Sequence, residues 1–128
     1  MTDSWHTPQW VLDMFPDFWD PCPFNPDWNE SMPDALEINW DETKIFVNPP
    51  YSNPLPWVEK VLDTKLSHNM AGKKSTIVML LKHDTSTRWY KLLHEAGARI
   101  LMFSGRLSFT NPDYKEMKSP HPSILVVI

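Results

Sequence analysis

The chain has 128 residues, of which 41% are hydrophobic and 22% charged, a composition typical of one globular domain with one core. No apolar run approaches the roughly 18 residues of a membrane helix, so we expect no membrane contact and a cytoplasmic location. The single cysteine, Cys22, excludes an internal disulfide, and no cysteine or histidine spacing indicates a metal site. We expect residues 1–128 to form one domain without a metal and without a separate target-recognition domain.

The formal net charge of −4 argues against a protein that binds nucleic acid only because it is basic. The charges are unevenly distributed along the chain. Residues 1–70 contain three basic and twelve acidic residues, whereas residues 71–128 contain nine basic and four acidic ones. One face of the protein can therefore be positive, although an ordinary solvated surface explains any single basic residue equally well.

The first half of the chain predicts one short helix and one short strand. Thr7 is expected to cap a helix with Pro8 at its first position, followed by apolar residues between Trp10 and Phe15. Residues 16–42 show no clear periodicity. Lys44 to Val47 is predicted to be a buried strand that stops at the stiff tetrapeptide Asn48-Pro49-Pro50-Tyr51.

The second half alternates helix and strand. The predicted elements are a helix from about Pro54 to Asn69, a buried strand from Thr76 to Leu81, a helix from Ser86 or Thr87 to Gly97, and strands at Arg99–Phe103, Arg106–Phe109 and Ser123–Ile128. This order predicts an α/β fold with a mostly parallel sheet and an antiparallel pair at its C-terminal edge.

The tetrapeptide Asn48 to Tyr51 is the strongest candidate for a functional site, because ligands of open α/β sheets bind beyond the carboxyl ends of strands. The Asn48 side-chain oxygen and the Pro49 carbonyl supply two acceptors, which suit the two N–H donors of an exocyclic amine. The Tyr51 ring supplies a face on which a base can stack. A loop that is merely stiff is the alternative interpretation.

Segments along nearly the whole chain carry a family resemblance: Trp5-His6-Thr7-Pro8-Gln9-Trp10, Asp20-Pro21-Cys22, Asp34-Ala35-Leu36 before Trp40, Phe46 to Ser52, Val78 to Leu81, Thr87-Arg88-Trp89, Gly105 to Phe109 and Pro122-Ser123. In these segments the chain resembles the phage-type, Dam-like DNA N6-adenine methyltransferases. The resemblance implies a minimal class I, Rossmann-like fold that uses S-adenosylmethionine to methylate N6 of adenine in DNA. If a phage encodes the protein, the resemblance implies that the protein acts in the cytoplasm of the bacterial host.

The resemblance also implies roles for individual residues. Asn48 and the Pro49 carbonyl would accept the two N–H bonds of the adenine amine, in the loop stiffened by Pro50, and Tyr51 would stack on the extruded base. Cofactor-binding residues on this basis are Thr7, Pro8, Asp20, Pro21, Cys22, Asp34 and Asn48. The candidate DNA contacts are Ser52, Lys82, Arg88 and Arg106.

Other interpretations of these residues remain open. Thr7 and Asp34 are also suited to helix capping, and Asp20 to a turn before Pro21. Only 27 residues separate Asp20 from Asn48, fewer than is typical of methyltransferases. The alternative functions are therefore a non-catalytic, methyltransferase-like nucleic-acid-binding protein, or a methyltransferase that acts on amino groups of RNA or protein.

The final strand, Ser123 to Ile128, is almost entirely apolar and needs to be covered. One subunit without a target-recognition domain also offers little surface for DNA, whose specific complexes bury on the order of 1,000 Å² of protein. A symmetric homodimer would cover the strand and enlarge the DNA-binding surface. The alternative is that this strand lies in the interior of the sheet.

Overall fold

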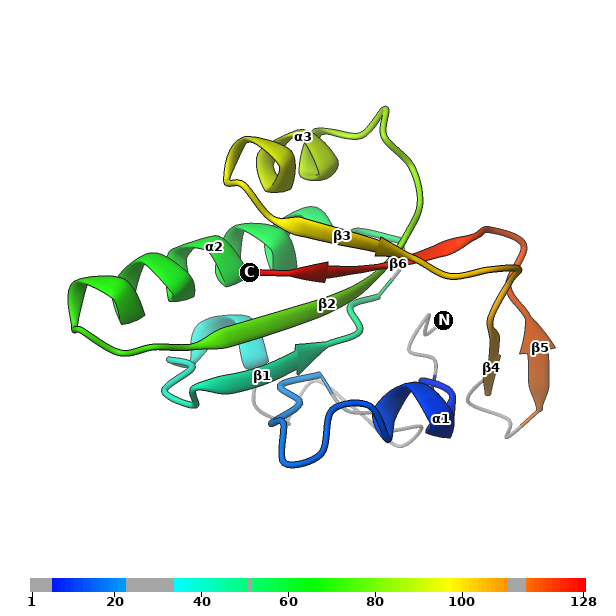
Figure 1. Ribbon diagram of the computed structural model, residues 1–128, viewed down its shortest axis with the longest axis horizontal. Helices are drawn as coiled ribbons and strands as arrows, with labels where there is room; N and C mark the ends of the chain where they lie inside the picture. The colour runs from blue at the N-terminus through cyan, green and yellow to red at the C-terminus, as the bar shows by residue number, and fades with distance from the viewer. Residues whose placement is uncertain (1–5, 23–33, 51, 111–114) are drawn as a thin grey trace.

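The computed structural model describes residues 6–22, 34–50, 52–110 and 115–128. Its centre is a four-stranded sheet in the order β1-β2-β6-β3 (Figure 1). The strands of this sheet are β1 (Lys44–Val47), β2 (Thr76–Lys82), β3 (Arg99–Met102) and β6 (Ser123–Val127). The other elements are α1 (Gln9–Leu12), the 3-10 turn η1 (Ala35–Glu37), α2 (Leu55–Met70), α3 (Arg88–Glu95) and a separate hairpin of β4 (Ser108–Thr110) and β5 (Glu116–Lys118).

The fold is mixed α/β, but the prediction of a mostly parallel sheet with an antiparallel C-terminal edge is wrong. β1 and β2 pair in parallel, whereas β6 is antiparallel to both of its neighbours, β2 and β3. β6 lies inside the sheet, and Ser123 to Val126 are buried. An apolar run predicts burial on both faces of a sheet, but it does not reveal the direction or the neighbours of the strand.

β1, β2 and β3 nevertheless run in the same direction, since β2 and β3 are each antiparallel to β6. Their carboxyl ends therefore lie at the same end of the sheet, here called the carboxyl end. Lys82 is the last residue of β2, and Asn48 and Phe103 directly follow β1 and β3. The segment around Trp19 joins the other side of β1 in parallel. The Trp19 N–H donates to the Lys44 carbonyl, and the Phe46 N–H donates to the Trp19 carbonyl, both at 2.8 Å.

Two buried clusters hold the sheet between its covering layers. On one face, Ile45, Val47 and Met79 pack with Val58 of α2 and Leu93 of α3. The other face packs with α1 and the β4-β5 hairpin, in a cluster of Val11, Phe46, Val78, Leu80, Leu107, Phe109 and Leu125. Figure 1 shows α2 and α3 together on one side of the sheet and α1 on the other.

The predicted helices α2 and α3 are confirmed, and their ends follow from local chemistry. Pro54 precedes α2, and Thr87 caps α3 by accepting a hydrogen bond from the Tyr90 N–H. Gly97, just beyond α3, has φ +76°, which favours glycine at a helix end. Several boundaries differ from prediction, most of them by one residue. The larger differences are that α1 ends at Leu12 and that β4 begins at Ser108, after Arg106. Of the helices in the described ranges, none is long and apolar enough to span a membrane.

Candidate active site

Asn48 lies directly after β1, at the carboxyl end of the sheet. Its side chain is partly buried, Pro49 is buried beside it and Pro50 is partly buried. The two prolines restrict the backbone of the loop, and the buried strand β1 anchors its start. Tyr51, the fourth residue of the predicted motif, lies outside the described residues.

Thr7 contacts Asn48 across 41 positions of sequence. The Asn48 Nδ2 donates a hydrogen bond of 2.9 Å to the Thr7 Oγ1. The prediction that Thr7 caps the first helix is wrong, because Pro8 occupies the cap position and no side-chain capping bond forms there. The Thr7 hydroxyl instead joins the segment expected to bind the cofactor to the loop expected to bind the target amine.

A cavity of about 460 Å³ opens beside this contact, between the N-terminal segment and the β4-β5 hairpin. Thr7, Pro8 and Trp10 line one side of it, and Arg106 and Glu116 line the other. The volume is in the range of small-molecule sites. The family resemblance implies a cofactor contact for Thr7 and Pro8, and Arg106 is a candidate DNA contact. No sequence pattern indicates that all three residues border one cavity.

Asp20 lies at the carboxyl end of the sheet, one residue beyond the Trp19 pairing with β1. Its Oδ1 accepts a 2.8 Å hydrogen bond from the Cys22 N–H, which closes the turn around the buried Pro21. Burial raises the pKa of this carboxyl to about 6, against the lowering effect of the Cys22 N–H. The turn interpretation is therefore confirmed, and the same carboxyl is also poorly solvated.

Asp34 occupies a different setting from Asp20. It is exposed, and its Oδ1 accepts a 2.9 Å hydrogen bond from the Leu36 N–H at the start of η1. Capping is thus its observed local role. This bond lies within the turn at the start of η1, whereas Thr7 and Asn48 bond to each other.

The candidate DNA contacts lie at or after the carboxyl ends of strands. Ser52 comes shortly after β1, Lys82 ends β2, Arg88 begins the helix after β2, and Arg106 comes after β3. Ser52, Arg88 and Arg106 are exposed, whereas Lys82 is partly buried with its Nζ 3.7 Å from Asp84. Topology therefore gathers at one end of the molecule residues that are 54 positions apart at most.

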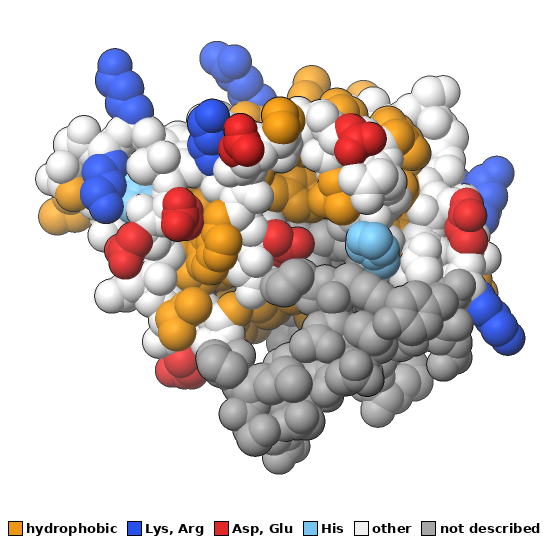
Figure 2. Space-filling model, turned by 90° about the horizontal axis from the view of Figure 1, so that it is seen from below, with side chains coloured by type: hydrophobic (Ala, Val, Ile, Leu, Met, Phe, Trp, Pro, Cys, Tyr) orange, Lys and Arg blue, Asp and Glu red, His pale blue; other side chains and the backbone are white. Residues whose placement is uncertain are grey.

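Positive charge does not cover the whole surface. Figure 2 shows the side of the molecule on which α1 lies, where acidic and basic side chains are mixed and apolar groups lie between them. Lysine and arginine side chains project at the margins of this face. In the described ranges, no three His, Cys, Asp or Glu side chains are grouped to hold a metal ion.

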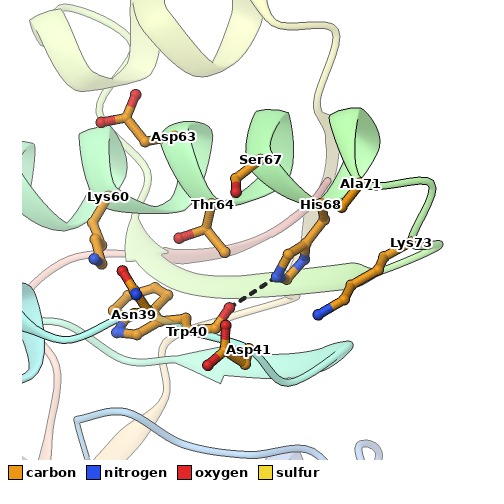
Figure 3. Close-up of a pocket in the computed structure, with 10 residues that line it drawn as sticks. All are labelled: Asn39, Trp40, Asp41, Lys60, Asp63, Thr64, Ser67, His68, Ala71 and Lys73. Atoms are coloured by element: carbon orange, nitrogen blue, oxygen red, sulfur yellow. Dashed lines mark hydrogen bonds between the residues drawn. The ribbon is translucent and has the colours of Figure 1, made fainter.

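A second cavity, of about 310 Å³, lies at the opposite end of the sheet (Figure 3). Asp41 precedes β1 and Lys73 precedes β2, while Lys60 and His68 line it from α2. The His68 Nε2 is 2.8 Å from the Trp40 carbonyl oxygen. Because ligands of such sheets bind at the carboxyl ends of strands, the cavity beside Thr7 is the better candidate.

Two comparisons with known proteins identify related sequences. The chain matches the DNA N-6-adenine-methyltransferase (Dam) family over residues 1–128. It is 30% identical over 139 residues to a DNA N-6-adenine-methyltransferase of Haemophilus phage HP1, a match that covers 98% of this chain and 78% of the relative. No solved structure gives a significant match.

An α/β protein with an Asn-Pro-Pro loop at the carboxyl end of its sheet fits the class of amino-methyltransferases. The chain belongs to the DNA N-6-adenine-methyltransferase (Dam) family, as the sequence predicted. It is an enzyme that transfers a methyl group to N6 of adenine in DNA. Family membership favours this function over the non-catalytic protein and over an acceptor in RNA or protein.

Asp20 gives a testable pH dependence. Its pKa is above the ordinary value of 3.8 in the folded state, so the native protein binds more protons between about pH 4 and about pH 6. The free energy of unfolding therefore falls as the pH rises through this range, by up to about 3 kcal/mol for a shift of about two pH units. Asp20→Asn keeps an oxygen acceptor for the Cys22 N–H and cannot ionise, so its stability is expected to lack this fall.

Urea unfolding of both proteins from pH 4 to pH 8 measures the difference. The free energy of unfolding of the Asp20→Asn variant relative to wild type is expected to rise between pH 4 and pH 6 and then to level off. Parallel pH profiles for the two proteins would show that Asp20 titrates normally in the folded state.

Proposed function

We propose that this enzyme takes its methyl group from S-adenosylmethionine and that Asn48 and Pro49 bind the target amine. The observation that carries the proposal is the 2.9 Å hydrogen bond between Thr7 and Asn48. It joins a segment implied in cofactor binding to the motif implied in amine binding, and a cavity of about 460 Å³ lies beside it. Two reactants held at such a junction meet in a fixed geometry, which is a major source of catalysis.

The residues present fit this cofactor. Burial holds the Asp20 carboxyl toward its neutral form, and a bound cation stabilises the ionised form of such a group. S-adenosylmethionine has cationic sulfonium and ammonium groups, and when bound it supplies an electrophilic methyl group. In this proposal Asp20, Pro21 and Cys22 contact the cofactor from the turn after Trp19. The backbone of Thr7 and Pro8 contacts it from the cavity, since the Thr7 side chain is bonded to Asn48, and Asp34 contacts its adenine.

Asn48 and Pro49 act on the acceptor nitrogen. The lone pair of an adenine amine is delocalised into the ring, which makes the amine a weak nucleophile. The Asn48 Oδ1 and the Pro49 carbonyl accept its two N–H bonds and favour the geometry in which the lone pair is available. They also stabilise the positive charge that develops on the nitrogen as the new bond forms. The methylated amine then loses one proton to water.

Pro50 and Tyr51 complete the loop in this proposal. Pro50 is partly buried and restricts the backbone that presents the Pro49 carbonyl. Tyr51 stacks on the adenine after the base leaves the duplex, which lowers the cost of extrusion. No covalent intermediate with the enzyme is needed, since the nitrogen would attack the methyl carbon directly while the bond from that carbon to the cofactor sulfur breaks and leaves a neutral thioether.

Three broader predictions accompany this function. Residues 1–128 form one catalytic domain, and the protein acts in the cytoplasm of a bacterial host, consistent with a phage relative. The homodimer stays a prediction, but β6 no longer supports it because that strand is interior. The surface that now favours a dimer is the edge strand β3, where Leu101 is 56% and Met102 is 72% exposed.

Asn48→Ala tests the proposed catalytic role. Loss of the side-chain acceptor is expected to lower kcat by about 10² to 10³, the usual effect of removing a group that stabilises developing charge. Methylation of duplex DNA by the purified variant, measured with radiolabelled S-adenosylmethionine at saturating concentration, gives this rate.

Asn39→Ala provides the matched control, since Asn39 is an exposed asparagine beside the cavity at the opposite end of the sheet. Its rate is expected to equal that of wild type. If the Asn48→Ala variant instead kept most of the wild-type rate, Asn48 would not be the acceptor for the target amine.

DNA binding by the carboxyl end of the sheet is tested with arginine variants. Arg88→Ala and Arg106→Ala are each expected to lower DNA affinity and to reduce the slope of log affinity against log salt concentration by about one, as for one lost phosphate contact. Fluorescence anisotropy with labelled duplex DNA at several salt concentrations measures both quantities.

Arg99→Ala is the control for charge alone, because Arg99 is exposed and begins β3 at the other end of the sheet. Its salt slope is expected to match that of wild type. Equal effects of all three substitutions would indicate a general electrostatic contribution and no local DNA contact.

A further inference from the structure

The Thr7 hydroxyl is fixed in place before any substrate arrives. Thr7 is 5% exposed, and the backbone next to it is paired with β4: the His6 N–H donates to the Thr110 carbonyl at 2.8 Å, and the Thr110 N–H donates to the His6 carbonyl at 3.3 Å. The hydroxyl is not used to cap α1, where Pro8 stands at the cap position. It accepts a hydrogen bond from Asn48 across the site.

The orientation of the Asn48 amide decides whether it can bind an amine. A carboxamide has an oxygen that accepts and a nitrogen that donates, and rotation by 180° about its last torsion exchanges them. With Nδ2 donating to Thr7, the planar amide directs Oδ1 away from Thr7. In the reversed orientation the target amine would meet N–H donors, which cannot accept its hydrogens.

We propose that Thr7 is a positioning residue for catalysis: its hydroxyl holds the Asn48 amide in the orientation that offers Oδ1 to the target amine. This inference rests on the proposed function of Asn48 as an acceptor. It adds to the cofactor-binding role that the family resemblance implies for Thr7, because the Thr7 hydroxyl acts here through Asn48 and not on the cofactor.

The same contact strengthens Asn48 as an acceptor when catalysis needs it. The target N–H, the Asn48 amide and the Thr7 hydroxyl form a chain of two hydrogen bonds, and each bond polarises the other. Positive charge grows on the target nitrogen during methyl transfer, so the chain is stronger in the transition state than in the ground state. An interaction of this kind raises kcat and has little effect on substrate binding.

Thr7→Val removes the hydroxyl while preserving shape. We expect kcat for DNA methylation to fall about tenfold, the rate equivalent of one hydrogen bond. The Kd for S-adenosylmethionine, measured by calorimetric titration, is expected to stay unchanged. Thr7→Ser restores the hydroxyl, and its kcat is expected to return to within about threefold of wild type, since one positioned hydrogen bond is regained.

Thr64→Val controls for the cost of replacing a buried threonine, because Thr64 is 7% exposed and lies on α2 beside the cavity at the other end of the sheet. Its kcat is expected to equal that of wild type. A weaker cofactor affinity with normal kcat at saturation in Thr7→Val would show a cofactor contact and overturn the positioning role. A kcat equal to that of wild type with normal cofactor affinity would overturn it as well.

Different results would contradict the role of Thr7 and the function of the enzyme. A wild-type protein that does not methylate adenine in DNA defeats the proposed function itself. An active wild type whose Thr7→Val variant is equally active defeats only the role of Thr7. A double-mutant cycle of Thr7→Val and Asn48→Ala in urea unfolding adds a readout without catalysis: a positive coupling is expected, and additive effects would contradict the contact.

Discussion

The parallel alignment of β1 with β2 on one side and with Trp19 on the other is the constraint on which the rest of the structure depends. Hydrogen bonds fix the Trp19 segment against Lys44 and Phe46, and the ladder with β2 fixes the opposite side of the strand. Parallel segments end together. Asp20 and Asn48 therefore reach the same end of the sheet without any direct contact between them being required.

Burial of polar groups at this end of the sheet lowers the stability of the protein. A domain with only a structural role would not need these buried groups. Asp20 loses solvation, Thr7 is nearly inaccessible, and the Asn48 side chain is partly buried beside two prolines. Stability comes instead from the apolar clusters on the two faces of the sheet. Such a separation lets the site keep groups oriented for chemistry while the core holds them still.

Much of the fold could be predicted from local pattern. Helices α2 and α3 and strands β1 and β2 follow from apolar spacing, from the Thr87 cap and from glycine beyond α3. The place of β6 could not be predicted, because the run Ile124 to Val127 requires burial but does not specify partners or direction. The hairpin boundaries depend on tertiary pairing of β4 with β5 and with His6.

The candidate site was predictable as a set of residues but not as an arrangement. The Asn-Pro-Pro loop was recognisable because of its position after a buried strand and because of its chemistry. The contact between Thr7 and Asn48 has no signal in sequence spacing, since a turn pattern at Thr7-Pro8 favours capping and the true partner lies 41 positions away. Arg106 and Thr7 line the same cavity, which is likewise a result of tertiary packing.

We infer that the carboxyl end of the sheet directs methyl transfer to one atom, N6 of adenine in DNA. The most direct measurement is mass spectrometry of nucleosides from duplex DNA treated with the purified protein and S-adenosylmethionine carrying a deuterated methyl group. We expect N6-methyldeoxyadenosine that carries the label, and no labelled methylcytosine. Label on another nucleoside, or no labelled nucleoside with a folded protein, would contradict it.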